Sequence, residues 1–112
     1  MIITSTNRGT AAVISPRGEI DFSTLPEVIA AAAELPLSVT EVTWDLREAQ
    51  FMDVAGLHLL VHQQLACRKA KRKLTVVGLQ QQPLRLLAVA QDVFPGHPWG
   101  DLLQRDLPIV AA

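Results

Sequence analysis

The spacing of apolar positions changes several times along the chain, and each change predicts a new element. Apolar and polar residues alternate over 41–46, which is typical of a strand with one buried face. From about residue 54 to about residue 70, apolar side chains recur at intervals of three and four, as in a helix that lays one side on a core. The pattern therefore predicts a strand, a short connector and a helix in the middle of the chain.

Further strands and helices are expected on both sides of this unit. The segment 74–77 is a short apolar strand, expected to run parallel to 41–46. Phe51 and Met52 in the connector are expected to fill the core, and Thr24 and Glu27 stand in capping-box spacing at a helix start. The remaining expected elements are strands at 1–4, 11–15 and 19–21, with a turn at 5–9 and a break at 16–18, helices at 24–35 and from Pro83, and a short helix in the 97–112 tail that covers the sheet.

The composition limits the class of protein that these predicted strands and helices can form. With 112 residues, 49% of them apolar, the chain is expected to form a single α/β domain over 1–112. It has 11 acidic and 10 basic side chains, so direct binding to nucleic acid is not expected. No leader and no apolar run long enough for a bilayer is visible, and Cys67 is the only cysteine. We expect a cytoplasmic protein without membrane insertion.

Few residues suggest catalytic or metal chemistry. His58 and His62 share one face of the predicted helix but have no evident third ligand, so no metal site is expected. Cys67 lies near the basic helix end 68–73, which would favour its thiolate, but no histidine can be placed beside it. No phosphate-binding glycine loop, nucleophile–base pair or cofactor motif is present. The sequence predicts a protein that is not an enzyme and has no cofactor.

The start of the central helix is the more informative stretch. Asp53 is placed to cap the first free amide groups of this helix. Val54 and Ala55 follow it, and the preceding connector is expected to keep both near the surface. Neither side chain carries a hydroxyl, so this helix end cannot be phosphorylated. Gly56 permits either tight packing of the helix on the sheet or close approach by a partner.

Two blocks of sequence resemble the STAS family, best known as bacterial anti-sigma-factor antagonists. The run from Phe51 to Leu57, preceded by Asp45-Leu46, is similar to the family signature, which reads Asp-Ser-Ser-Gly-Leu where this chain has Asp-Val-Ala-Gly-Leu. The segment 18–21, followed by Thr24, is similar to the family's Gly-Glu-Leu-Asp segment. The resemblance implies a STAS-like α/β fold, with about four to five mixed strands and three to four helices packed mainly on one face.

The resemblance also implies a function and a site. It suggests a regulatory binding module whose partner is an anti-sigma factor, a serine-protein kinase of the ATPase-kinase type. Ala55 matches the serine that is phosphorylated in such family members. Asp21 and Asp53 match acids that contribute to recognition of the kinase, although both could also act only as caps. The partner-binding residues expected on this basis are Asp21, Ser23, Thr24, Asp53, Val54, Ala55, Gly56 and His58.

Several alternatives stay open at this point. Val54 and Ala55 could be packing substitutions, could make a permanently active antagonist, or could mark a scaffold that was never switched by phosphate. Ser23 or Thr24 could be a substitute phosphorylation site. The chain could instead be a STAS regulatory subunit of an ABC-type lipid transporter, although a threonine follows the aspartate in such relatives. A homodimer is also possible on this sequence.

Overall fold

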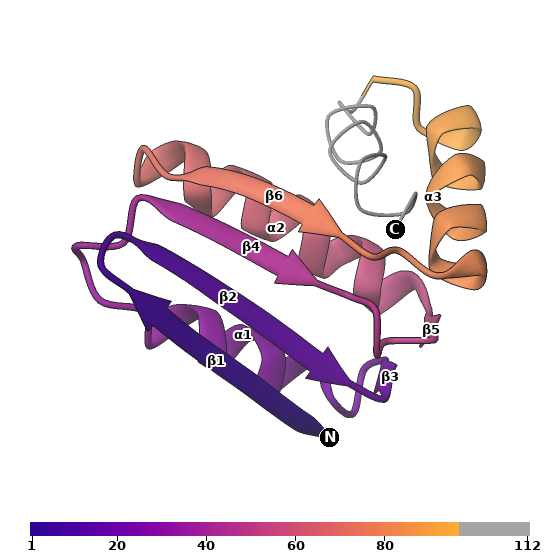
Figure 1. The fold of residues 1–112 in the computed structure, drawn as a ribbon. Coiled ribbons are helices and arrows are strands. Elements are labelled where there is room, and N and C mark those ends of the chain that lie inside the picture. Colours follow the sequence, from indigo (N-terminus) through magenta and orange to yellow (C-terminus); the bar gives the residue numbers. More distant parts are fainter. Residues whose placement is uncertain (97–112) are drawn as a thin grey trace.

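The computed structural model describes residues 1–96, and they form a mixed four-stranded sheet with a small second sheet at one end. The main sheet has the order β1-β2-β4-β6, with β1 antiparallel to β2 and the other three strands parallel (Figure 1). Strands β3 and β5 pair in parallel beside the carboxyl ends of β2 and β4. The strands are β1 (Ile2–Arg8), β2 (Ala11–Arg17), β3 (Glu19–Ile20), β4 (Glu41–Asp45), β5 (Phe51–Met52) and β6 (Lys73–Val77).

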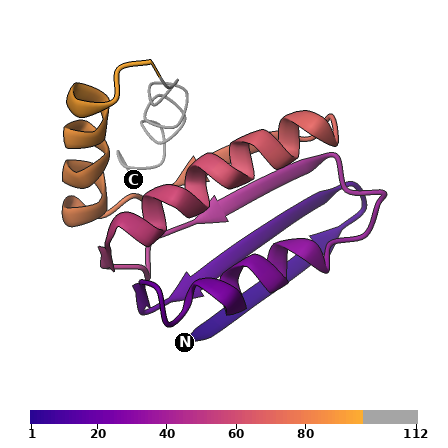
Figure 2. The same cartoon turned by 180° about the vertical axis from the view of Figure 1, so that it is seen from behind.

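Two of the three helices formed by residues 1–96 cover the same face of the main sheet. Helices α1 (Leu25–Ala33) and α2 (Val54–Lys69) lie side by side on it, as seen from behind in Figure 2. Helix α3 (Gln81–Val93) stands beyond the carboxyl ends of the parallel strands and packs on β5. The predicted α/β fold with mixed strands is confirmed.

The core lies between the sheet and the two covering helices. Ile14 of β2, Trp44 of β4, and Leu59 and Leu60 of α2 are all essentially inaccessible to solvent. Trp44 comes from the alternating positions that the sequence pattern assigns to the buried face of its strand, and Leu60 from the predicted helix stripe. Leu59 lies beside that stripe, and Leu65, which the helical spacing places on it, is 53% exposed. Burial of the large core side chains is the main stabilising contribution to the fold.

The first hairpin differs from its expected form. Strand β1 continues to Arg8, so the expected turn at 5–9 is wrong and only Gly9 and Thr10 form the turn. Gly9 adopts a positive φ of 63°, which a glycine accepts without strain. Strand β2 also continues through Pro16, because the ladder between β2 and β4 ends at Ile14, before the missing N–H of the proline would be needed.

Other expectations are corrected or lie outside the description. Phe51 is 42% exposed, so only Met52 of that pair fills the core. Alternation along β5 explains this, since neighbouring strand residues point to opposite faces. The helix expected in the 97–112 tail lies outside the described residues. Within residues 1–96, no helix has the length and hydropathy that crossing a membrane would require.

Candidate functional site

The short β3–β5 ladder brings the two candidate acids to one edge of the molecule. Ile20 is paired with Met52 in this ladder, and the N–H of Asp53 donates to the Ile20 carbonyl at 3.2 Å. Asp21 and Asp53 are the next residues on the two strands. They therefore lie at neighbouring strand ends, where α1 and α2 begin, although 32 positions separate them in the sequence.

Asp53 caps helix α2 as the sequence predicts. Its backbone is extended, and its carboxylate Oδ1 accepts a hydrogen bond of 2.8 Å from the N–H of Ala55. The helix contains no acidic residue in its first turn and has Arg68 and Lys69 in its last. The two basic side chains therefore offset the negative end of the helix dipole, and Asp53 places a negative charge at its positive end.

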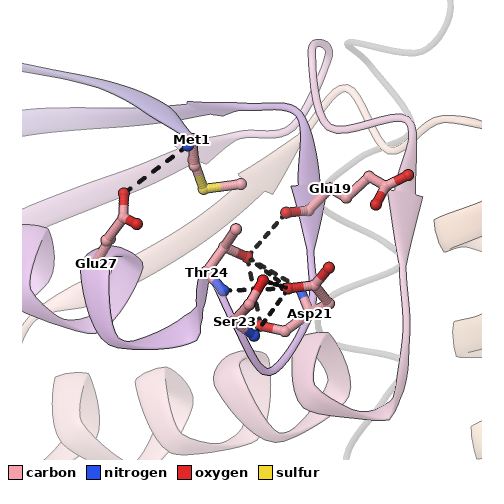
Figure 3. Close-up of polar contacts among 6 residues, drawn as sticks. All are labelled: Met1, Glu19, Asp21, Ser23, Thr24 and Glu27. Atoms are coloured by element: carbon pink, nitrogen blue, oxygen red, sulfur yellow. Dashed lines mark hydrogen bonds and ion pairs between the residues drawn. The ribbon is translucent and has the colours of Figure 1, made fainter.

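Asp21 organises the turn that leads into α1, as Figure 3 shows. Its Oδ1 accepts hydrogen bonds from the N–H of Ser23 at 2.9 Å, the hydroxyl of Ser23 at 2.6 Å and the N–H of Thr24 at 3.1 Å. The hydroxyl of Thr24 does not cap the helix. It donates to the Glu19 carbonyl at 2.8 Å and accepts from the N–H of Asp21 at 3.0 Å.

The expected capping box is therefore wrong. Glu27 lies 4.0 Å from the amino group of Met1 instead of reaching back to Thr24 (Figure 3). The hydrogen bonds around Asp21, chiefly that from the Ser23 hydroxyl, hold the pKa of its carboxyl below the ordinary value. Asp21 is thus held as a carboxylate with a fixed orientation at the start of α1.

The two residues after Asp53 have opposite environments. Val54 is 55% exposed, whereas Ala55 is fully buried, and Gly56 is buried beside it. The expectation that Ala55 lies near the surface is wrong, because the first turn of α2 sits directly on β5. A Cβ added at Gly56 would lie 2.8–2.9 Å from the side-chain atoms of Met52. Of the two possible roles of Gly56, the structure shows tight packing of helix on strand.

The remaining expected contact residues keep accessible surface. Ser23 and His58 are exposed, and Asp21, Thr24 and Asp53 are partly exposed. Phe22 lies between Asp21 and Ser23 and is 71% exposed. The sequence interpretation missed it; exposed aromatic residues of this kind are enriched at protein interfaces. We call the set Asp21, Phe22, Ser23, Thr24, Asp53, Val54 and His58 the docking surface.

Gln82 of α3 is a second residue that the sequence interpretation missed. Its side-chain Oε1 accepts from the N–H of Met52 at 2.9 Å, and its Nε2 donates to the Met52 carbonyl at 3.0 Å. The amide thereby pairs with β5 as a third strand would, on the edge opposite β3. It fixes the strand on which the first turn of α2 packs.

The other candidate chemistry finds little support in the geometry. His58 and His62 are both exposed on α2, and no group of three potential ligands for a metal ion occurs within residues 1–96. Cys67 is buried, and this burial raises the pKa of its thiol, while the charge of Arg72 acts in the opposite direction. The thiolate is therefore not favoured, despite the basic helix end beside it.

Comparison with protein families decides the class of this fold. A family model described as "Mlab, STAS domain" matches residues 3–91, which includes both helix starts of the docking surface. The chain belongs to the STAS domain family. No curated protein sequence matches it significantly.

Solved structures of anti-sigma factor antagonists are similar in fold but distant in sequence. Phosphorylated SpoIIAA of Bacillus matches with a TM-score of 0.64 and 20% identity, over 88% of this chain and 87% of that one. Its unphosphorylated form, an anti-sigma factor antagonist, matches with 0.62 and 19%, over 88% and 86%. An anti-sigma factor antagonist from Mycobacterium paratuberculosis matches with 0.61 and 22%, over 84% and 82%. The fold is therefore one that anti-sigma factor antagonists adopt.

Proposed function

We propose that this STAS domain is a non-enzymatic binding module that docks on an anti-sigma factor of the ATPase-kinase type. By sequestering that partner, it would free a sigma factor and so regulate transcription. The observation that carries the proposal is the docking surface, in which exposed Phe22 and Val54 stand beside the carboxylates of Asp21 and Asp53. Apolar anchors next to oriented charges are the usual make-up of a specific protein interface.

The burial of Ala55 changes how this surface would work. Ala55 matches the serine that the resemblance to the family signature marks as phosphorylated, and it is fully buried in the first turn of α2. Without a hydroxyl it accepts no phosphate, so no repulsive charge is added next to Asp53. The exposed tip of the helix is Val54 alone. We infer that the module binds without being switched at this position.

Isothermal titration with an anti-sigma factor of the ATPase-kinase type from the same genome tests the proposal. We expect binding, and a loss of at least about 30-fold in affinity for Phe22→Ser or Val54→Lys, as for residues at the centre of an interface. Asp53→Asn keeps the helix cap and removes the charge, so it separates recognition from folding. Leu37→Ser is the matched control, because Leu37 is 98% exposed in the α1–β4 loop, away from the docking surface.

Mass spectrometry of the same mixture after incubation with ATP reports whether the chain is phosphorylated. We expect no phosphate on any residue from 53 to 57, since none carries a hydroxyl. If the folded Phe22 and Val54 variants bound as tightly as the control, the docking surface would be refuted.

A second candidate is a regulatory subunit bound to the ATPase of an ABC-type lipid transporter. The absence of a hydroxyl at Ala55 favours it, because such a subunit needs no phosphoserine, whereas Val54 stands where such relatives have a threonine after the aspartate. A scaffold that binds independently of phosphate would share this feature. Co-purification with an ATP-binding cassette subunit, lost in Val54→Lys and kept in Leu37→Ser, would favour the transporter candidate over an anti-sigma factor.

A further inference from the structure

Strand β1 is an edge of the main sheet, and its pairing with β2 determines which of its backbone groups are free. The two-residue turn closes on the pair Arg8 and Ala11, so this pair exchanges hydrogen bonds and the pairs alternate from there. Ile3 is opposite Pro16, which has no N–H, in agreement with this alternation. The N–H and C=O groups of Ile3, Ser5 and Asn7 therefore point away from β2, toward the open edge.

The side chains of the same three residues line a groove along this edge. A groove of about 370 Å³ lies between β1 and α1, lined by Ile3, Ser5 and Asn7 on the strand side. On the helix side, the small Ala30 and Ala31 leave room, and Glu27 and Glu34 stand at the two ends. The edge thus provides free backbone groups for hydrogen bonds and a groove for side chains, which are what an added strand needs.

Strand β1 also lacks the features by which proteins usually block an edge. From Ile2 to Asn7 it has no charged residue, proline or glycine, and its seven residues form an unbroken ladder with β2. Within residues 1–96, no second strand pairs with it. An edge of this kind pairs readily with another extended chain unless something covers it.

The charge of the groove indicates which chain would pair. Glu34 forms no ion pair among the described residues, and Glu27 has only the amino group of Met1 at 4.0 Å. A second copy added through its own β1 would bring its own Glu27 and Glu34 to the same groove, so four carboxylates would face one another. Like charges in such an arrangement oppose pairing, whereas lysine or arginine side chains would be attracted.

We propose that the β1 edge binds an extended segment of another protein that carries lysine or arginine at alternate positions. The segment pairs with the free groups of Ile3, Ser5 and Asn7, and its basic side chains reach Glu27 and Glu34. This surface shares no residue with the docking surface, although Glu27 at one end of the groove lies one helix turn after Thr24. The inference does not depend on the identity of the partner at α2.

A blocked seven-residue peptide of alternating valine and lysine is the probe, followed by NMR on the full chain. We expect the amide protons of Ile3, Ser5 and Asn7 to exchange with solvent at least about tenfold more slowly when the peptide binds, because they gain hydrogen bonds. The amides of Thr4 and Thr6 serve as an internal control, because they already face β2. A peptide that is N-methylated at every residue should not bind, because it has no N–H group left to pair with β1.

Two variants test the two parts of the site. Ser5→Pro removes one outward N–H without touching the ladder to β2, and we expect it to weaken peptide binding at least about tenfold. Ser5→Thr is its matched control and should bind like the original chain. Glu34→Lys should weaken binding of the lysine peptide and strengthen binding of a valine–glutamate peptide.

Three results would overturn the proposal. The first is that the lysine peptide does not bind, or binds no better than the glutamate peptide. The second is that folded Ser5→Pro binds as well as Ser5→Thr. The third is a dimer of the chain in sedimentation that Ser5→Pro dissociates, because the occupant of the edge would then be a second copy.

Discussion

Replacing Gln82 tests whether its side chain fixes β5, the strand on which the first turn of α2 packs. The side-chain amide of Gln82 forms hydrogen bonds with both the N–H and the C=O of Met52, a residue with no solvent-accessible surface. In Gln82→Ala, the buried N–H and C=O of Met52 lose these partners. A buried polar group left unpaired costs about 1–3 kcal/mol, so we expect a loss of about 2 kcal/mol in the free energy of unfolding. For a domain of this size, that corresponds to a fall of roughly 10 °C in Tm.

Urea unfolding measures this loss, with Gln81→Ala as the matched control, because Gln81 is the exposed neighbour in the same helix turn. Hydrogen exchange adds a local readout. The amide proton of Met52 should be protected in the control and exchange much faster in Gln82→Ala. If the two variants had free energies of unfolding within about 0.5 kcal/mol of each other, the assigned role of Gln82 would be wrong.

Gln82→Glu separates the two hydrogen bonds of the amide. An ionised carboxylate can accept from the N–H of Met52 but faces its carbonyl as a second acceptor, so the variant should be destabilised at neutral pH. Protonation restores a donor, which means that the pKa of the introduced carboxyl is raised in the folded state. Relative to Gln82→Ala, the stability of this variant should therefore increase as pH falls toward about 4 and decrease as pH rises.

Three further predictions concern the two helix starts. Gly56→Ala should lower the free energy of unfolding by about 1–3 kcal/mol in urea titration, because its Cβ would overlap the Met52 side chain. Asp53→Ala should cost about 1 kcal/mol by the same assay and Asp53→Asn much less, since asparagine also caps. The pKa of Asp21 is depressed in the fold, so its contribution is complete above the ordinary value of 3.8 and is lost as pH falls through the folded pKa. Asp21→Asn should reduce the slope of stability against pH in that range.

The central part of the fold was predictable from the sequence, because its pattern is local and periodic. Strand β4 and helix α2 follow alternation and helical spacing within a few residues of their observed bounds. Asp53 as the cap also follows from adjacent residues alone. Strand β1 was predicted too short, since its exposed threonine, serine and asparagine side chains carry no apolar alternation.

The parts of the site that were missed depend on contacts between distant residues. Gln82 and Met52 are 30 positions apart, and no sequence pattern relates a glutamine side chain to the backbone of a two-residue strand. The burial of Ala55 depends on how α2 is rotated about its own axis. This rotation is set by the close approach of Gly56 to Met52, which becomes apparent only when helix and strand are placed together.

The burial of Ala55 bears on the proposal that binding is not switched at this position. The residue is fully buried in the first turn of α2 and lacks a hydroxyl, so a kinase would find neither an accessible side chain nor an acceptor group there. Ser23 carries an exposed hydroxyl beside Asp21, with its oxygen 2.6 Å from Oδ1 of that residue. The hydroxyl of Thr24 instead donates to the Glu19 carbonyl and accepts from the N–H of Asp21. A charge added at Ser23 would repel Asp21 and break the turn before α1, so the docking surface is more sensitive to modification there than at α2.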